Sequence, residues 1–199
     1  MPPENLGEHT LRENNSQAAL LHIRLRYFFP ENRTHISSWR PSHDTVKSLH
    51  NIIVQGFGNI TIKGDYRRDH RTILHSPHTI PIPHKIPRFQ IVPYLMDEFL
   101  VYLGSRWEDI NPYQLGALCM WRLSHIHPFE DGNDRTSRLF CYLCMTMKIG
   151  TWIRGSDTIL YQLEQEPFRS QYYGALQQGD NGNLNPLADL LLNLSLIHI

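Results

Sequence analysis

At 199 residues the chain is long enough for one domain with a sizeable core and an N-terminal extension. Its 19 basic and 19 acidic residues give a formal net charge of zero with the histidines neutral, so no overall positive charge attracts nucleic acid or anionic lipid. The 3 cysteines argue against a disulfide scaffold and suit a reducing compartment. No apolar run is long enough to span a membrane and no secretory signal is visible, so we expect a cytoplasmic protein, with export left open.

In chain order, residues 1–16 are polar and predict a loose arm. Apolar residues then recur at helical spacing, and a capping side chain, a proline or a glycine marks several helix ends, as at Ser42, Asn111 and Gly150. These patterns predict helices over residues 18–29, 43–55, 93–103, 112–126, 133–148, 157–176 and 187–194.

Residues 59–92 have a different pattern. Ile60 and Ile62 alternate with polar residues, which is typical of a strand. Several prolines follow, including Pro81 and Pro87, and they remove backbone donors that a central strand would need. The segment therefore predicts an edge hairpin or flap, and the whole chain predicts an all-α fold with a small β-hairpin flap.

The densest group of chemically useful side chains is the run His127-Pro128-Phe129-Glu130-Asp131-Gly132-Asn133-Asp134-Arg135-Thr136-Ser137-Arg138. Pro128 disfavours helical geometry at His127, so this histidine is expected where a helix ends, and an imidazole titrates near neutrality. The free N–H groups that start the next helix, with Arg135 and Arg138 on one side of it, indicate phosphate binding. Asp131 beside them is suited to hold a Mg²⁺ ion that bridges phosphate oxygens.

This run resembles the signature of the Fic family, His-Pro-Phe-x-Asp/Glu-Gly-Asn-Gly/Lys-Arg, with a second arginine three residues further on. The likeness extends more loosely over residues 46–150, where Gly64-Asp65-Tyr66-Arg67 is similar to the family's Gly-x-Tyr-Arg segment. The resemblance implies a Fic-type helical bundle. It also implies a protein adenylyltransferase that moves AMP from ATP to a Ser, Thr or Tyr hydroxyl of a target protein, with Mg²⁺ as cofactor.

The same resemblance implies a role for each residue of the motif. His127 is the general base that deprotonates the target hydroxyl, and Asp131 is the metal ligand. Phe129, grouped with the nucleotide-binding residues, is a core anchor that fixes the loop.

The remaining motif residues bind the phosphates in this resemblance. Gly132 and Asn133 contribute to the nest for the α-phosphate, Arg135 holds the β-phosphate and Arg138 the γ-phosphate. The flap near residues 72–91 pairs with an extended segment of the target protein by strand addition.

Residue 134 departs from the family pattern, which has glycine or lysine where this chain has Asp134. Two interpretations stay open. The carboxylate weakens ATP binding, by repelling the phosphates or by competing with them for Arg135 or Arg138, or it points to solvent and complements the positive end of the helix. Two alternatives to AMP transfer also stay open: a catalytically silent nucleotide- or protein-binding module, and transfer of another phosphate-containing group.

Three other clusters have plainer interpretations. His125 and His127 lack a third zinc ligand at the usual spacing. Cys141 and Cys144 lie in an apolar helix, so we expect buried structural cysteines rather than a redox pair. The basic run over residues 67–71 is expected to be a solvated turn rather than a nucleic-acid site, because the net charge is zero.

We divide the chain into a helical N-terminal extension (1–41), a Fic domain (42–193) and a tail (194–199). Translation of a common transposase adapter would give the tail sequence, so we expect it to be artefactual. No Ser/Thr-x-x-x-Glu-Gly/Asn inhibitory pattern precedes the motif. Control by an inhibitory partner protein, or by a C-terminal inhibitory helix missing from this sequence, is therefore left open.

Overall fold

The computed structural model describes residues 6–29, 36–69, 86–152 and 161–196. Every regular element in these ranges is a helix, so the all-α fold class is confirmed. The predicted hairpin falls mostly on residues 70–85, outside the described ranges. The elements are α1 (Leu6–Tyr27), α2 (His43–Ile53), the short 3-10 helix η2 (Phe89–Ile91), α3 (Val92–Ser105), α4 (Pro112–Ile126), α5 (Asn133–Ile149), α7 (Phe168–Asp180) and α8 (Asn185–Leu196).

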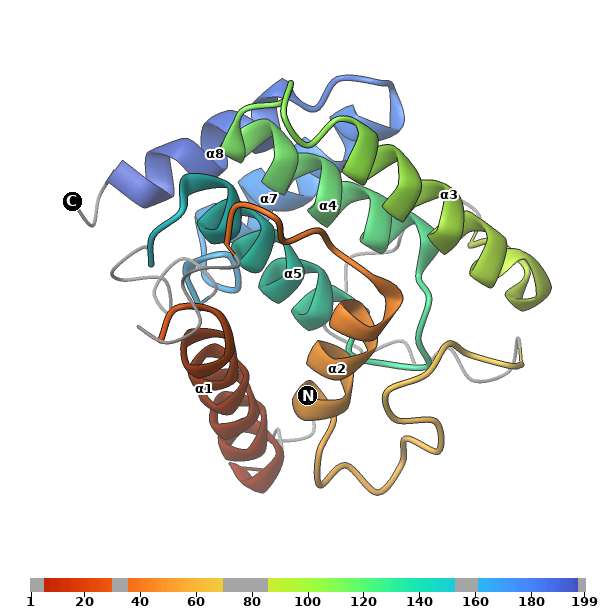
Figure 1. Ribbon diagram of the computed structural model, residues 1–199. Coiled ribbons are helices and arrows are strands. Elements are labelled where there is room, and N and C mark those ends of the chain that lie inside the picture. The colour runs from red at the N-terminus through yellow and green to blue at the C-terminus, as the bar shows by residue number, and fades with distance from the viewer. Residues whose placement is uncertain (1–5, 30–35, 70–85, 153–160, 197–199) are drawn as a thin grey trace.

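Helix α5 lies at the centre of the molecule, and α1, α2 and α4 pack against it (Figure 1). Every residue from Thr136 to Met147 is buried, which is the pattern of a core helix rather than of a surface helix. Gly116 lets α4 approach closely, because a Cβ there would lie 2.6 Å from the sulfur of Met145. Cys141 and Cys144 are buried in this core as expected, and burial raises the pKa of both thiols.

The capping residues read from the sequence end the helices where expected. The Ser42 side chain accepts the backbone N–H of Thr45 at the start of α2, and Asn111 accepts two N–H groups at the start of α4. Gly150 closes α5 in the left-handed conformation, with φ of 79°. These caps fix the start of α4 and the end of α5, the two helices that flank the loop over residues 127–132.

The loose arm predicted for residues 1–16 is wrong from Leu6 onward, since α1 begins there. The side chain of Asn15 is buried and donates to the carbonyls of Ile53 and Gln55 at 3.0 and 2.8 Å, just where α2 ends. Leu11 packs over Gly56 in the same region. Contacts with α2 therefore stabilise a helix whose own sequence is too polar to predict one.

The helix predicted over residues 157–176 is also misplaced. Residues 157–160 lie outside the described ranges, and α7 begins at Phe168, directly after Pro167, and continues to Asp180. A proline fits the start of a helix better than its interior, so Pro167 sets the boundary. Among the described residues, the helices fall short of the length and apolar character that a membrane crossing requires.

Candidate functional site

His127 stands at the junction between α4 and the loop over residues 127–132. It is the C-cap of α4, with φ of 52° and ψ of 60°. Among the described non-glycine residues it alone has a positive φ. This conformation costs free energy for an L-residue, and Pro128 disfavours the helical alternative at His127. The sequence thus ends the helix here and leaves a strained backbone at the candidate base.

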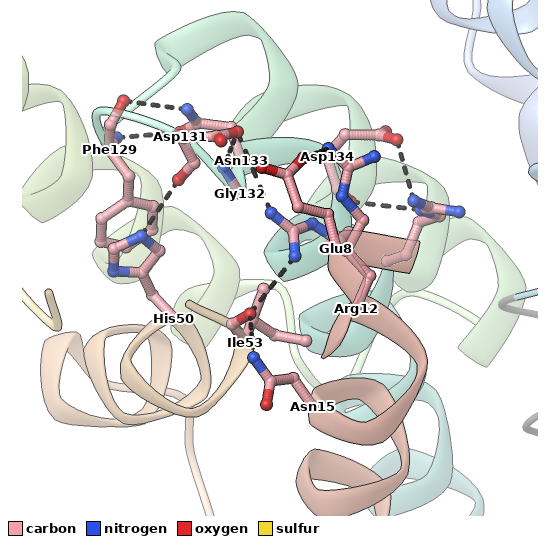
Figure 2. A network of polar contacts seen from close by, with 12 residues as sticks. Glu8, Arg12, Asn15, His50, Ile53, Phe129, Asp131, Gly132, Asn133 and Asp134 are labelled. Carbon is pink, nitrogen blue, oxygen red and sulfur yellow. Dashed lines mark hydrogen bonds and ion pairs between the residues drawn. The ribbon is translucent and has the colours of Figure 1, made fainter. Parts of the chain in front are cut away.

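Two side chains close the loop from within (Figure 2). Phe129 is fully buried, and its ring stacks on the imidazole of His50 with 3.8 Å between the centroids. The Asn133 side chain accepts the N–H of Phe129 at 2.8 Å and donates to the Phe129 carbonyl at 2.9 Å. Because this amide is used inside the loop, Asn133 has its backbone N–H to offer an anion.

The loop is also tied to α2 and to residues 60–64. His50 accepts the N–H of Gly64 at Nδ1, at 3.0 Å, so Nε2 carries the proton and donates to the Asp131 carbonyl at 3.0 Å. Burial lowers the pKa of His50 to about 4, which agrees with a neutral imidazole. The buried Glu130 carboxylate accepts the N–H of Thr61 at 2.9 Å and its hydroxyl at 2.8 Å.

Arg67 is buried, so the solvated turn predicted for the basic run is wrong at this residue. Its side chain is 2% exposed. Its backbone N–H donates to the Pro128 carbonyl at 2.8 Å, its Nε to the His127 carbonyl at 2.7 Å and its Nη2 to the Pro87 carbonyl at 2.6 Å. Carbonyl oxygens from distant parts of the chain replace water around this cation, which a local sequence pattern cannot indicate. The neighbouring Arg68 is 74% exposed and pairs with Asp65.

Helix α5 begins directly after the loop without a side-chain cap at its N-terminus. Gly132 precedes it with φ of 74°, and a Cβ there would lie 2.9 Å from Cγ1 of Val54. Only glycine fits both the conformation and the space. The Asp131 side chain accepts the N–H of Gly132 and is 31% exposed, so its carboxylate can still be reached from solvent.

Arg135 lies in the first turn of α5 and contacts the end of α2. Its Nη1 donates to the Ile53 carbonyl at 3.3 Å, its Nη2 lies 4.0 Å from Oδ1 of Asp131, and the guanidinium lies over the Phe57 ring. Burial lowers the pKa of Arg135, and the nearby Arg12 of α1 adds to this effect. Its ion pair with Asp131 is long, so the charge of Arg135 is less fully neutralised than a closely paired guanidinium would be and is available to an anion.

Arg138 is in a different state, because two carboxylates hold it. Its Nη2 lies 3.0 Å from Oδ2 of Asp134 and 2.5 Å from Oε1 of Glu164, and the side chain is 4% exposed. Burial opposes the charge, yet these two carboxylates outweigh it and raise the pKa of Arg138. The hydroxyl of Tyr172 in turn donates to Asp134 at 2.7 Å. Asp134 thus does not simply point to solvent but pairs with Arg138 and accepts from Tyr172.

The sequence reasoning missed several residues of this site, namely His50, Glu130, Glu164 and Tyr172. A signal existed for His50, which falls on the apolar face of α2 with Val46 and Ile53, where a polar side chain needs a partner. No local pattern marks Glu164 or Tyr172, because their partners lie 26 and 38 residues away.

We next asked whether side chains in the described residues could hold a metal ion. No group of three His, Cys, Asp or Glu side chains able to hold an ion occurs in the part of the chain that the structure describes. His125 lies 3.4 Å from Asp180 instead. The accessible carboxylate of Asp131, beside a helix start without a side-chain cap, does fit Mg²⁺, an ion that proteins often hold through one or two carboxylates with water as further ligands.

Comparisons with known proteins agree on one family. Residues 40–145 match the sequence model described as "Fic/DOC family". A "Protein adenylyltransferase Fic" from Drosophila mojavensis is 37% identical over 93 residues, which is 46% of this chain and 17% of the relative. One from Nematostella vectensis is 26% identical over 155 residues, 72% of this chain and 34% of the relative. The chain therefore spans a small part of these relatives.

Solved structures share the fold. Fic-1 from C. elegans (residues 134–508) superposes with a TM-score of 0.67 at 21% identity, covering 98% of this chain and 51% of that chain. A Fic family protein from Desulfovibrio desulfuricans G20 gives a TM-score of 0.60 at 19% identity, covering 98% and 67%. At these identities the likeness supports the fold alone.

Proposed function

Because the chain belongs to the Fic/DOC family, we propose that it transfers AMP from ATP to a Ser, Thr or Tyr hydroxyl of a target protein. The relatives named protein adenylyltransferase support this activity at the level of the family. The observation that carries the proposal is the loop between α4 and α5. It joins His127, Asp131 and Arg135 to a helix N-terminus without a side-chain cap.

His127 is the general base in this proposal. An imidazole accepts a proton near neutral pH, and a positioned base typically contributes about 10²- to 10⁴-fold to a rate. The backbone of His127 is held rather than free to rotate, since its carbonyl accepts from Arg67 and its N–H donates to the Leu123 carbonyl. The imidazole therefore starts from a fixed main-chain position at the mouth of the loop.

The start of α5 receives the phosphates. Its N–H groups and the positive end of the helix attract the α-phosphate, and Gly132 lets the backbone come close. Arg135 holds the β-phosphate. Asp131 would hold Mg²⁺, which when bound neutralises charge on the phosphate oxygens. The chain's own part is to keep the Asp131 carboxylate near the helix start through its contact with the Gly132 N–H.

The target protein is proposed to dock on the flap near residues 72–91. Of this segment the structure describes residues 86–91, including η2, which lead into α3. An extended target segment that adds alongside a flap strand would present its hydroxyl in a fixed register. Orientation of this kind is a main contribution to phosphoryl-transfer catalysis.

The pairing of Arg138 favours a second candidate function, a module that binds a nucleotide or a protein without catalysis. Asp134 and Glu164 already neutralise the cation that a γ-phosphate would need. A chain in which this pairing persists binds ATP weakly. It would then act as a silent binding module, or use a donor that places no phosphate at Arg138.

Labelled ATP incubated with the protein and a cell lysate separates these possibilities. Protein label from α-labelled ATP alone supports AMP transfer, and label from γ-labelled ATP alone supports phosphate transfer. No label from either, with ATP binding seen by calorimetry, supports the silent module and overturns the proposal. The His127→Ala variant is the control for background labelling by other enzymes of the lysate.

A further inference from the structure

We propose that Arg67 is the positioning residue for His127, holding the backbone of the candidate base and tying it to the chain at Pro87. The proposal rests on the proposed function only for the role of His127 as base. The contacts of Arg67 themselves are independent of any activity.

Arg67 supplies three hydrogen-bond donors, two to the start of the loop and one to the segment before η2. The backbone N–H and Nε of Arg67 reach the carbonyls of Pro128 and His127, and Nη2 reaches the carbonyl of Pro87. Pro87 lies two residues before η2, which leads into α3. A guanidinium is planar and its donors form a rigid fork, so these carbonyls are held in a fixed relation. A lysine ammonium cannot reproduce that fork.

The contact with His127 matters because its backbone is strained. At φ of 52° the residue has left the helix, and its carbonyl accepts from Arg67. Without this donor, the extended conformation that residues before proline prefer becomes the lower-energy state. Rotation of the main chain at His127 would move the imidazole, because the side chain starts from that backbone. Arg67 thus selects the strained conformer.

A contribution to folding stability explains the burial of Arg67 less well than a positioning role does. The side chain is 2% exposed, and its described partners are carbonyl oxygens rather than a carboxylate. Burying a charge is costly, and hydrogen bonds to carbonyl oxygens offset only part of that cost. What accounts for a buried guanidinium here is the geometry that it holds.

The test uses two variants of Arg67 and two controls. Arg67→Lys keeps the charge without the fork, and Arg67→Met keeps most of the volume without charge or donors. Arg40→Lys is the matched control, since Arg40 also donates to two backbone carbonyls but far from the loop along the chain. Leu187→Ala on α8 removes a fully buried side chain and controls for loss of stability as such.

The first measurement is hydrogen exchange of the backbone amides over residues 127–133. We expect exchange about tenfold faster in both Arg67 variants and unchanged in Arg40→Lys, with no selective change in Leu187→Ala. The second measurement is calorimetry with Mg-ATP together with label transfer. ATP affinity should stay near the parental value, while transfer falls on the order of a hundredfold because the base is misplaced.

Unchanged exchange over residues 127–133 in folded Arg67→Lys and Arg67→Met would overturn the proposal. So would faster exchange with full transfer activity. If the parental protein transfers nothing, the proposed function fails, and the exchange experiment still decides whether Arg67 positions His127. If one Arg67 variant does not fold, the other carries the test.

Discussion

Replacing Asp134 with glycine is expected to tighten ATP binding about tenfold. In the structure the carboxylates of Asp134 and Glu164 lie 3.0 and 2.5 Å from Nη2 of Arg138. A γ-phosphate that uses Arg138 must displace at least one of them. Asp134→Gly removes the first competitor and gives residue 134 the glycine of the family pattern.

The magnitude follows from the bond that is lost. A hydrogen bond between charged groups contributes about 1.5–3 kcal/mol, which corresponds to about ten- to a hundredfold in affinity. Because the Asp134 side chain is 39% exposed and that of Glu164 48%, solvent screening favours the lower end of this range. Stability should fall at the same time, since the buried Tyr172 hydroxyl loses its acceptor, at a cost of about 1–3 kcal/mol.

Calorimetry with ATP and ADP on the parental protein, Asp134→Gly and Asp134→Asn tests this reasoning. Asp134→Asn keeps an acceptor for Tyr172, so its melting temperature should fall less. ADP lacks the γ-phosphate, so its affinity should hardly change. If ATP and ADP tighten by the same factor, general repulsion and not competition for Arg138 is the cause. If neither tightens, Asp134 does not oppose ATP at all.

Three further predictions concern the loop. His127→Ala should lower label transfer about 10²- to 10⁴-fold with ATP binding by calorimetry nearly intact, and a parental transfer rate would exclude His127 as base. Asp131→Ala should abolish transfer that depends on Mg²⁺, whereas full parental activity in excess chelator would exclude a metal role. Gly132→Ala should melt at a lower temperature than Gly150→Ala. Both glycines have positive φ, but only at Gly132 would the new Cβ lie 2.9 Å from Val54, so equal melting temperatures would contradict the crowding.

Much of the site could be predicted from sequence because its signals are local. Each signal depends on neighbouring residues only: Pro128 directly after His127, a glycine at 132, and two arginines three residues apart. In the structure each of them has its expected place relative to α4 or α5. Helix positions follow from apolar periodicity and caps for the same reason. The predicted helix boundaries were wrong where a helix lacks these signals, as at the polar start of α1.

Pairings between distant residues could not be predicted. Asn15 caps the end of α2, His50 holds the Asp131 carbonyl, and Arg67 is buried among carbonyls. Each contact joins residues that are 38 to 81 positions apart in the chain.

The sequence by itself determined which residues enter the loop and the helix that follows it, because φ and ψ preferences and helix capping act between neighbours. Only the tertiary structure decided how each of the two arginines is paired. Arg135 and Arg138 have the same chemistry and lie on the same helix. The fold places Glu164 and the Tyr172-bound Asp134 close against Arg138. Against Arg135 it places the Ile53 carbonyl, an aromatic ring and, at 4.0 Å, the Asp131 carboxylate. Desolvation and nearby charge depend on what packs around a group, and packing is a property of the folded chain.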